Sequence, residues 1–253
     1  MVPQRYFLEI SYHGKNYVGW QIQPNGSSVQ AQIIQALSLL LREPVTTLGC
    51  GRTDTGVHAR QFYLHFDALN PLPDDLVERM NRFLPADIAV KRLITDVPQD
   101  AHARFDATYR AYDYYIHFDK NPFLTEFSFF FPWKPLNLDV MQQAVTLLPQ
   151  YTDFRMFCKS GASSKTTLCN LYKAEIIADE NNQTLRFHIA ANRFLRGMVR
   201  RIVGCLLFMG KEKITFEEFK EVMDEHKKQF PKMNISVPPQ GLFLSEVRYP
   251  FIR

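Results

Sequence analysis

Hydrophobic and polar residues follow regular patterns along the first hundred residues, and these patterns predict a series of strands and helices. Alternation of the two kinds of residue marks strands, and apolar residues at helical spacing behind capping residues mark helices. In chain order we predict a strand over 6–12, a helix through Leu41 capped by Ser27 and Ser28, a short strand from Val45, a strand over 61–66, a helix from 73 to 84 and a strand over 88–94. This β-α-β-β-α-β order is the split arrangement of ferredoxin-like folds.

The second half shows the same kinds of pattern without detectable sequence repetition. The predicted elements are a strand over 108–118, an irregular connection that contains the aromatic run 127–133, a helix over 138–148, strands over 168–178 and 185–190, helices over 193–209 and 216–226, and a strand over 242–249. We therefore predict an α+β fold class with two ferredoxin-like lobes, residues 1–103 and residues 104–253, made of antiparallel sheets and helices. We expect an active-site cleft between the lobes.

The composition is that of an ordinary soluble globular protein, with 253 residues, of which 46% are hydrophobic and 22% are charged. The net charge of +4 and the isoelectric point near 8.8 fit a nucleic-acid partner without requiring one. The apolar run at 206–209 is too short to cross a membrane, and no charged leader with an apolar segment opens the sequence. We expect a cytoplasmic protein that does not bind a membrane.

Cysteine and histidine spacing does not indicate a metal ion. The four cysteines are scattered and never form a C-x-x-C pair, so we expect reduced thiols. The seven histidines include no close pair at the spacing of metal ligands on a helix. Neither a Walker sequence nor G-x-G-x-x-G is present, so the sequence also predicts no bound nucleotide.

The segment 49–59, GCGRTDTGVHA, is the strongest candidate for chemistry. Three glycines surround Asp54, which has an arginine, two threonines and a histidine for neighbours. Glycine allows turns and close backbone approaches that a Cβ atom would block, so such a loop can present side chains. The alternative is an ordinary turn, in which the aspartate caps its own backbone. In the predicted fold, this segment is the loop between the two middle strands.

Two further features each allow a functional and a structural interpretation. On the predicted helix 193–209, the side chains of Arg193, Arg196 and Arg200 fall within about 60° of one another. They form either a solvated face or a set that binds phosphate or a catalytic carboxylate. Tyr112, on the predicted strand 108–118, either packs in the core or stacks on a base.

Five segments, in order, resemble motifs of the tRNA pseudouridine synthase A family, and together they cover nearly the whole chain. They are Tyr12-x-Gly14 with Tyr17-x-Gly19-Trp20-Gln21, the GRTDTGVHA segment 51–59, the ARFDAT segment 103–108 leading to Tyr112, the FLRGMVRRIVG segment 194–204, and the GLFLSEV segment 241–247. The resemblance implies an isomerase that converts uridine to pseudouridine in the anticodon stem-loop of tRNA, at positions 38, 39 and 40. It implies no cofactor and no metal, and a homodimer that binds tRNA.

The same resemblance assigns roles to particular residues. Asp54 is the catalytic nucleophile or general base, and Arg200 is its ion-pair partner. Tyr112 stacks on the target uracil and acts as a general acid or base. Leu242 forms an apolar wall for the base, and the N-terminal motif helps to hold RNA. We expect the substrate to be bound by polar and basic residues near these positions, namely Arg52, Thr53, His58, Arg60, Arg104, Arg110, Arg193 and Arg196.

Two other functions remain open at this point. A non-catalytic RNA-binding protein or chaperone would use the arginines and aromatic residues but would not need Asp54 beside Arg200. A glycoside or nucleoside hydrolase could use Asp54 as its nucleophile but would usually need a second carboxylate. Asp106 and Asp153 are weak candidates for that second group.

Overall fold

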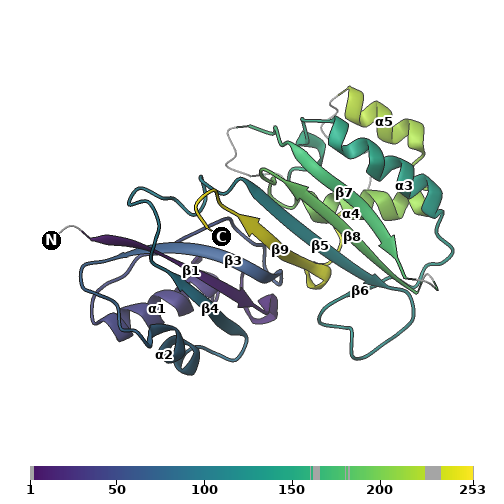
Figure 1. Cartoon of the computed structure of the whole chain (residues 1–253). Helices are drawn as coiled ribbons and strands as arrows, with labels where there is room; N and C mark the ends of the chain where they lie inside the picture. The colour runs from purple at the N-terminus through teal and green to yellow at the C-terminus, as the bar shows by residue number, and fades with distance from the viewer. Residues whose placement is uncertain are drawn as a thin grey trace. The chain divides into compact units, whose positions relative to one another are not determined.

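The computed structural model describes residues 3–159, 161, 166–179, 181, 183–225 and 235–252. The chain divides into two compact units (Figure 1). The first consists of Met1–Arg110 together with Phe243–Arg253, and the second is Ala111–Leu242. Among the described residues, no helix is both long enough and apolar enough to cross a membrane.

The first unit has the split arrangement that the sequence predicts. Its elements are β1 (Gln4–Tyr12), α1 (Val29–Leu41), β2 (Leu48–Gly49), β3 (His58–Ala68), α2 (Leu76–Phe83), β4 (Ile88–Ile94) and β9 (Leu242–Arg248, from Phe243 on). Strand β1 pairs antiparallel with β3 on one side and with β4 on the other, and β2 pairs with β3. The first four strands therefore lie in the order 4-1-3-2, which is that of ferredoxin-like folds.

Helices α1 and α2 cover one face of this sheet (Figure 1). Helix α1 begins where Ser28 accepts a hydrogen bond from the Ala31 N–H at 3.2 Å, as the capping pattern predicts. The strand predicted from Val45 is shorter than expected. Its first residues bond to side chains of α1 instead, since the Val45 N–H donates to Ser38 Oγ and Gln30 Nε2 donates to the Thr47 carbonyl.

Strand β9 returns to the first unit from the far end of the sequence. It pairs in parallel with β3, with Phe243 opposite His58, and the Val247 N–H donates to Gln61 Oε1 at 2.8 Å. The units therefore differ from the lobes expected at 1–103 and 104–253, because residues 104–110 and Phe243–Arg253 belong with the first unit. Pairing of distant segments leaves no local signal in the sequence.

The second unit repeats part of the same arrangement. It contains β5 (Tyr109–His117, from Ala111 on), β6 (Phe129–Phe130), α3 (Leu138–Leu147), β7 (Leu171–Ala178), β8 (Thr184–Ala191), α4 (Met198–Gly210) and α5 (Phe216–Asp224). The strand order is β5-β8-β7, with β6 parallel to β5 and with β7 and β8 antiparallel. Helix α3 contacts β7, α4 and α5 (Figure 1).

One predicted helix begins later than expected. Helix α4 starts at Met198 rather than at residue 193, because Gly197 adopts a left-handed conformation with φ of 69°. Arg193 and Arg196 therefore precede the helix, and the predicted helical stripe with Arg200 is wrong. Helix α5 ends at Asp224, and the predicted end at His226 lies outside the described residues.

Candidate active site

Asp54 lies in the loop between β2 and β3, as predicted. The first residue of this loop, Cys50, is hydrogen-bonded to β3. The Cys50 N–H donates to the Tyr63 carbonyl on β3 at 2.7 Å. A turn follows, in which the Val57 N–H donates to the Asp54 carbonyl at 3.1 Å. The Asp54 side chain is half-buried, Arg52 is exposed and Thr53 is buried. A carboxylate in this position is accessible while its backbone is held.

The N-terminal motif contacts the Asp54 loop directly. Tyr12 Oη and Thr53 Oγ1 are 2.9 Å apart in a hydrogen bond. The Trp20 N–H donates to the Thr53 carbonyl at 3.4 Å, and the Gly56 N–H donates to the Tyr17 carbonyl at 3.3 Å. The segment that the sequence predicts to hold RNA therefore braces the residues on both sides of Asp54. Its contact with RNA stays a prediction.

Two glycines make this close approach possible. A Cβ atom on Gly14 would lie 2.0 Å from the Val57 carbonyl oxygen, and one on Gly19 would lie 2.2 Å from the Thr53 carbonyl oxygen. The Gly14 N–H also donates to His58 Nδ1 at 3.0 Å. His58 Nδ1 therefore carries no proton, and any ring proton is on Nε2.

His58 is buried, with 1% of its surface exposed, although we expected it to contact substrate. Its ring stacks on Phe243 with centroids 4.5 Å apart and lies 4.5 Å from the ring of His13. Thr53 is 8% exposed. Both side chains face the protein interior of the first unit, and their predicted contact with substrate stays a prediction.

Arg110 connects Cys50, at the start of the Asp54 loop, to the segment 104–107. It is 9% exposed, and its Nε and Nη2 atoms both donate to the Cys50 carbonyl, at 3.2 and 2.9 Å. Its Nη1 donates to the Ala107 carbonyl at 3.0 Å, and Nη2 also donates to the Arg104 carbonyl at 2.6 Å. A planar guanidinium can serve several acceptors at fixed angles. Arg110 thus bridges the two segments from within the unit rather than at its surface.

Burial raises the pKa of the Cys50 thiol to about 11, although the Arg110 charge opposes this. The thiol is therefore protonated near neutral pH and is not a competing nucleophile beside Asp54.

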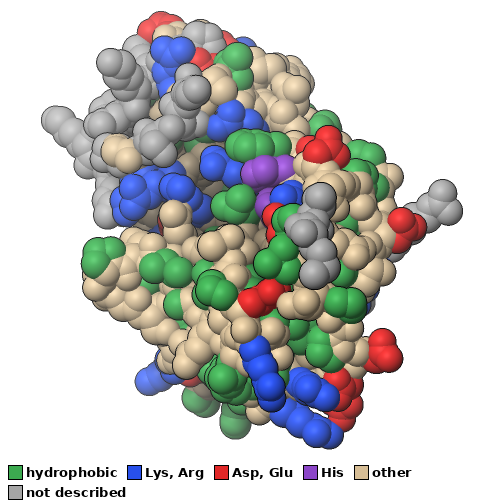
Figure 2. All heavy atoms as spheres, turned by 90° about the vertical axis from the view of Figure 1, so that its left-hand side faces the viewer, with side chains coloured by type: hydrophobic (Ala, Val, Ile, Leu, Met, Phe, Trp, Pro, Cys, Tyr) green, Lys and Arg blue, Asp and Glu red, His purple; other side chains and the backbone are tan. Residues whose placement is uncertain are grey.

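The exposed cationic side chains of the first unit's predicted site are those of Arg52, Arg60 and Arg104. The Arg60 guanidinium lies 5.1 Å from the centre of the Phe243 ring. On the face drawn in Figure 2, Lys and Arg side chains lie in separate groups with hydrophobic and acidic side chains between them. The Lys and Arg side chains visible on this face therefore form several groups.

The second unit holds Tyr112 and Arg200. Tyr112 is half-buried on β5, and its ring meets that of Phe194 edge to face with centroids 5.1 Å apart. Arg200 is in the first turn of α4, where its Nε donates to the Val237 carbonyl at 2.7 Å and its carbonyl accepts from the Val237 N–H at 3.3 Å. The helix start is thereby joined to the segment before β9.

The other predicted residues of the second unit differ in accessibility. Arg193 is half-buried and Arg196 is exposed, and the Arg196 carbonyl accepts from the Lys159 N–H at 2.9 Å. Leu242 is 6% exposed. It follows Gly241, where a Cβ atom would lie 2.7 Å from the Tyr115 carbonyl oxygen. The proposed role of Leu242 as a wall for the base stays a prediction.

The structure thus gathers the predicted residues into two groups. The first unit carries Arg52, Thr53, Asp54, His58, Arg60, Arg104 and Arg110, and the second carries Tyr112, Arg193, Arg196, Arg200 and Leu242. Asp54 belongs to the first unit and Arg200 to the second, and their ion pair stays a prediction. Sequence reasoning missed the bracing role of Tyr12 and Trp20, for which the close-approach glycines of their motif were the available signal.

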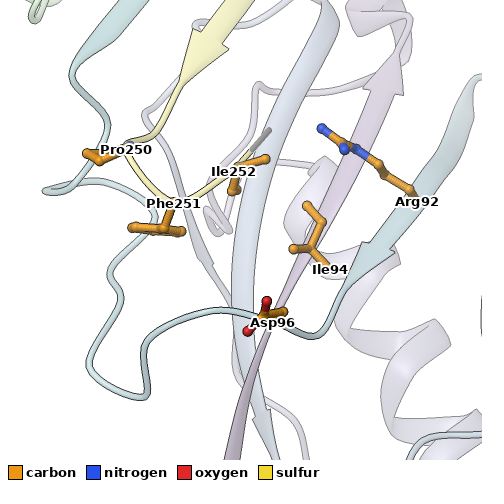
Figure 3. Close-up of a pocket in the computed structure, with 6 residues that line it drawn as sticks. All are labelled: Arg92, Ile94, Asp96, Pro250, Phe251 and Ile252. Atoms are coloured by element: carbon orange, nitrogen blue, oxygen red, sulfur yellow. The ribbon is translucent and has the colours of Figure 1, made fainter.

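A pocket of about 530 Å³ lies elsewhere in the first unit (Figure 3). It is lined by Arg92, Ile94, Asp96, Pro250, Phe251 and Ile252. None of these is a predicted site residue, and Arg92 donates to Glu9 at 2.6 Å and to Tyr63 at 3.0 Å. Among the described residues, no group of three or more His, Cys, Asp or Glu side chains could hold a metal ion.

A family model and several related proteins point to the same family. A family model described as tRNA pseudouridine synthase matches residues 151–250. A tRNA pseudouridine synthase A from Azobacteroides pseudotrichonymphae is 44% identical over 97% of this chain and 97% of its own length. Proteins of the same name from Parabacteroides distasonis and Bacteroides thetaiotaomicron are 44% and 45% identical over 98% of this chain, and over 96% and 91% of their own lengths.

A solved structure, of an unknown protein from Galdieria sulphuraria, covers 84% of this chain and 94% of its own. It has 10% identity and a TM-score of 0.24.

The curated relatives define the class of this protein as an isomerase that acts on uridine in tRNA. The chain belongs to the tRNA pseudouridine synthase A family. The predicted family, enzyme class and α+β fold class are confirmed.

Proposed function

We propose that this protein isomerises uridine to pseudouridine in the anticodon stem-loop of tRNA, at positions 38, 39 and 40, with Asp54 as its catalytic residue. One observation carries the assignment of Asp54. Its carboxylate is accessible on a loop whose flanking residues are fixed by Tyr12, Trp20 and Tyr17. Such fixed placement lowers the cost of orienting a catalytic group toward its substrate.

In the proposed reaction, the Asp54 carboxylate acts on the sugar of the target nucleotide. It either attacks C1′ and displaces the base or removes the proton from C2′. In both routes the bond between C1′ and N1 breaks, the uracil turns, and a new bond joins C1′ to C5. In the first route the bond between Asp54 and C1′ breaks as C5 attacks, and in the second the proton held by Asp54 returns to C2′. The hydrogen on C5 then leaves as a proton, and N1 gains one. No oxidant, reductant or further reactant is needed.

Arg200, Tyr112 and Leu242 complete this proposal. A guanidinium beside Asp54 would keep the carboxylate ionised when substrate excludes water. Tyr112 would stack on the detached uracil and act as acid or base, and Leu242 would limit its movement. The half-buried position of Tyr112, beside Phe194, fits a ring with one accessible face. The target nucleotide must leave its stack, so we propose that Arg52, Arg60, Arg104, Arg193 and Arg196 contact the RNA backbone.

We further propose a homodimer and a cytoplasmic location. Two copies would double the positively charged surface that one tRNA can contact. All four cysteines are free thiols, which suits a reducing compartment. Sedimentation at micromolar concentration measures the dimer directly, and a monomeric profile contradicts it.

Release of tritium from a tRNA transcript labelled at C5 of uridine tests the proposed reaction. We expect release by the parent protein and none by Asp54→Ala, and loss of release when uridines 38, 39 and 40 are all replaced by cytidine. If the parent binds the transcript but releases no tritium, the protein is an RNA-binding protein without this activity.

A further inference from the structure

The turn at residues 102–107 presents an exposed aromatic ring in the first unit. Phe105 is 72% exposed. The Arg104 guanidinium lies 5.7 Å from the centre of the ring, and the ring of His102 lies beside it with centroids 4.2 Å apart and planes tilted by 33°. An exposed aromatic face beside a cation is the combination that binds a nucleobase and its phosphate.

Hydrogen bonds within the turn hold this ring in place. His102 Nδ1 accepts from the N–H groups of Arg104 at 3.1 Å and Phe105 at 3.3 Å. The His102 N–H donates to Asp106 Oδ2 at 2.7 Å, and the Asp106 N–H donates to the His102 carbonyl at 3.0 Å. Burial lowers the pKa of His102, which keeps Nδ1 free to accept these bonds near neutral pH.

The turn is also anchored to the rest of the first unit. The Ala103 N–H donates to His65 Nδ1 at 2.9 Å, and Tyr249 Oη donates to the Ala103 carbonyl at 2.5 Å. Because a ring on a fixed turn loses little freedom on binding, stacking on it costs less entropy than stacking on a mobile side chain.

Arg110 sets the position of this turn relative to the catalytic loop. The guanidinium that donates to the Arg104 and Ala107 carbonyls also donates to the Cys50 carbonyl, four residues before Asp54. One buried side chain therefore holds both the segment that presents Phe105 and the segment that presents Asp54. A base stacked on Phe105 would have a defined place relative to the reacting carboxylate.

We propose that Phe105 is a stacking site for an unpaired nucleobase of the RNA substrate, with Arg104 binding a phosphate beside it. This inference rests on the proposed function and adds a binding contact to it. The occupant is an unpaired base because only an unstacked base offers a free face to an aromatic side chain. The contact places RNA for reaction at Asp54 and takes no part in the chemical step.

Affinity for an unmodified tRNA transcript, measured by fluorescence anisotropy, tests this role in a set of Phe105 variants. We expect Phe105→Ala and Phe105→Leu to weaken binding by about 10-fold, and Phe105→Trp to bind as well as the parent. Leucine retains apolar area without an aromatic face, so the contrast with tryptophan isolates stacking. Phe123→Ala is the matched control, since Phe123 is 88% exposed and lies in the second unit; it should bind like the parent.

Two further readouts separate stacking from a structural role. Tritium release should show a raised KM with an unchanged kcat in Phe105→Ala, because the variant binds more weakly but reacts equally once bound. Arg104→Gln should lower the dependence of affinity on salt, whereas Phe105→Ala should leave it unchanged because no charge is lost.

The inference is overturned if all three Phe105 variants bind the transcript as tightly as the parent, or if all three bind it equally more weakly. It is also overturned if Phe123→Ala weakens binding as much as Phe105→Ala does. These outcomes leave the proposed function intact if the parent releases tritium. A parent that neither binds the transcript nor releases tritium overturns the proposed function and this inference together.

Discussion

Replacing Gly19 with alanine tests whether the N-terminal motif positions Asp54. Gly19 has φ of 101°, and a Cβ atom there would lie 2.2 Å from the Thr53 carbonyl oxygen and 3.2 Å from the Asp54 carbonyl carbon. The neighbouring atoms are backbone, so no side-chain rotation relieves the contact. The two segments must separate, which also lengthens the hydrogen bond from the Trp20 N–H to the Thr53 carbonyl, now 3.4 Å.

The cost follows from these contacts. Positive φ costs an alanine roughly 1–2 kcal/mol, and a forced backbone shift costs roughly 1–3 kcal/mol. We therefore expect Gly19→Ala to lower the free energy of unfolding by about 3 kcal/mol, which corresponds to a Tm lower by about 10 °C. Because a misplacement of about 1 Å at a catalytic group can cost about 100-fold in rate, kcat for tritium release should fall by about that factor.

Thermal unfolding and steady-state tritium release measure the two effects. Gly51→Ala is the matched control for stability, because Gly51 lies in the same loop as Asp54 and a Cβ atom there would meet nothing within 4 Å. Gly51→Ala should unfold at the temperature of the parent. The reasoning is refuted if Gly19→Ala is as stable and as active as the parent.

Three further changes test the same account of the first unit. Arg110→Lys should lower the unfolding free energy in urea by about 3 kcal/mol, because lysine cannot serve the Cys50 and Arg104 carbonyls together; an unchanged urea midpoint would contradict this. Tyr12→Phe should cost about 1 kcal/mol of stability through the lost bond to Thr53 and should lower kcat more than it changes KM; unaltered kinetics would count against the bracing role. Burial lowers the pKa of His65 to about 4 from 6.5, so the unfolded chain binds the proton first and stability should fall as the pH drops from 6.5 toward 4. His65→Gln should flatten that part of a stability-against-pH curve, and an equal slope in both proteins would refute the assignment.

The elements of this fold were predictable where their signals are local. Strand β4 spans Ile88–Ile94 as the alternating pattern predicts, and α1 begins after Ser28 because the serine side chain caps it. Alternation and capping depend on residues close together in the sequence, so a single chain reveals them. The place of Asp54 between β2 and β3 followed from the order of these elements.

Other features depend on the conformation or pairing of distant residues, which sequence patterns do not contain. The sign of φ at Gly197 decides where α4 begins, and a helical wheel drawn through Arg193 and Arg196 cannot show it. The arginine pattern likewise could not predict that the Arg110 side chain points inward and donates to backbone carbonyls. Strand β9 joins the first unit through its pairing with β3, across most of the chain.

Detection of pseudouridine in digested tRNA tests the central claim most directly. Unmodified transcript would be incubated with the parent or with Asp54→Asn, which keeps the size of the side chain and removes its charge, and the nucleosides would be separated by chromatography. We expect pseudouridine with the parent and none with Asp54→Asn, while both proteins bind the transcript with similar affinity. Pseudouridine formed at the parental rate by Asp54→Asn would contradict the assignment of Asp54 as the catalytic residue.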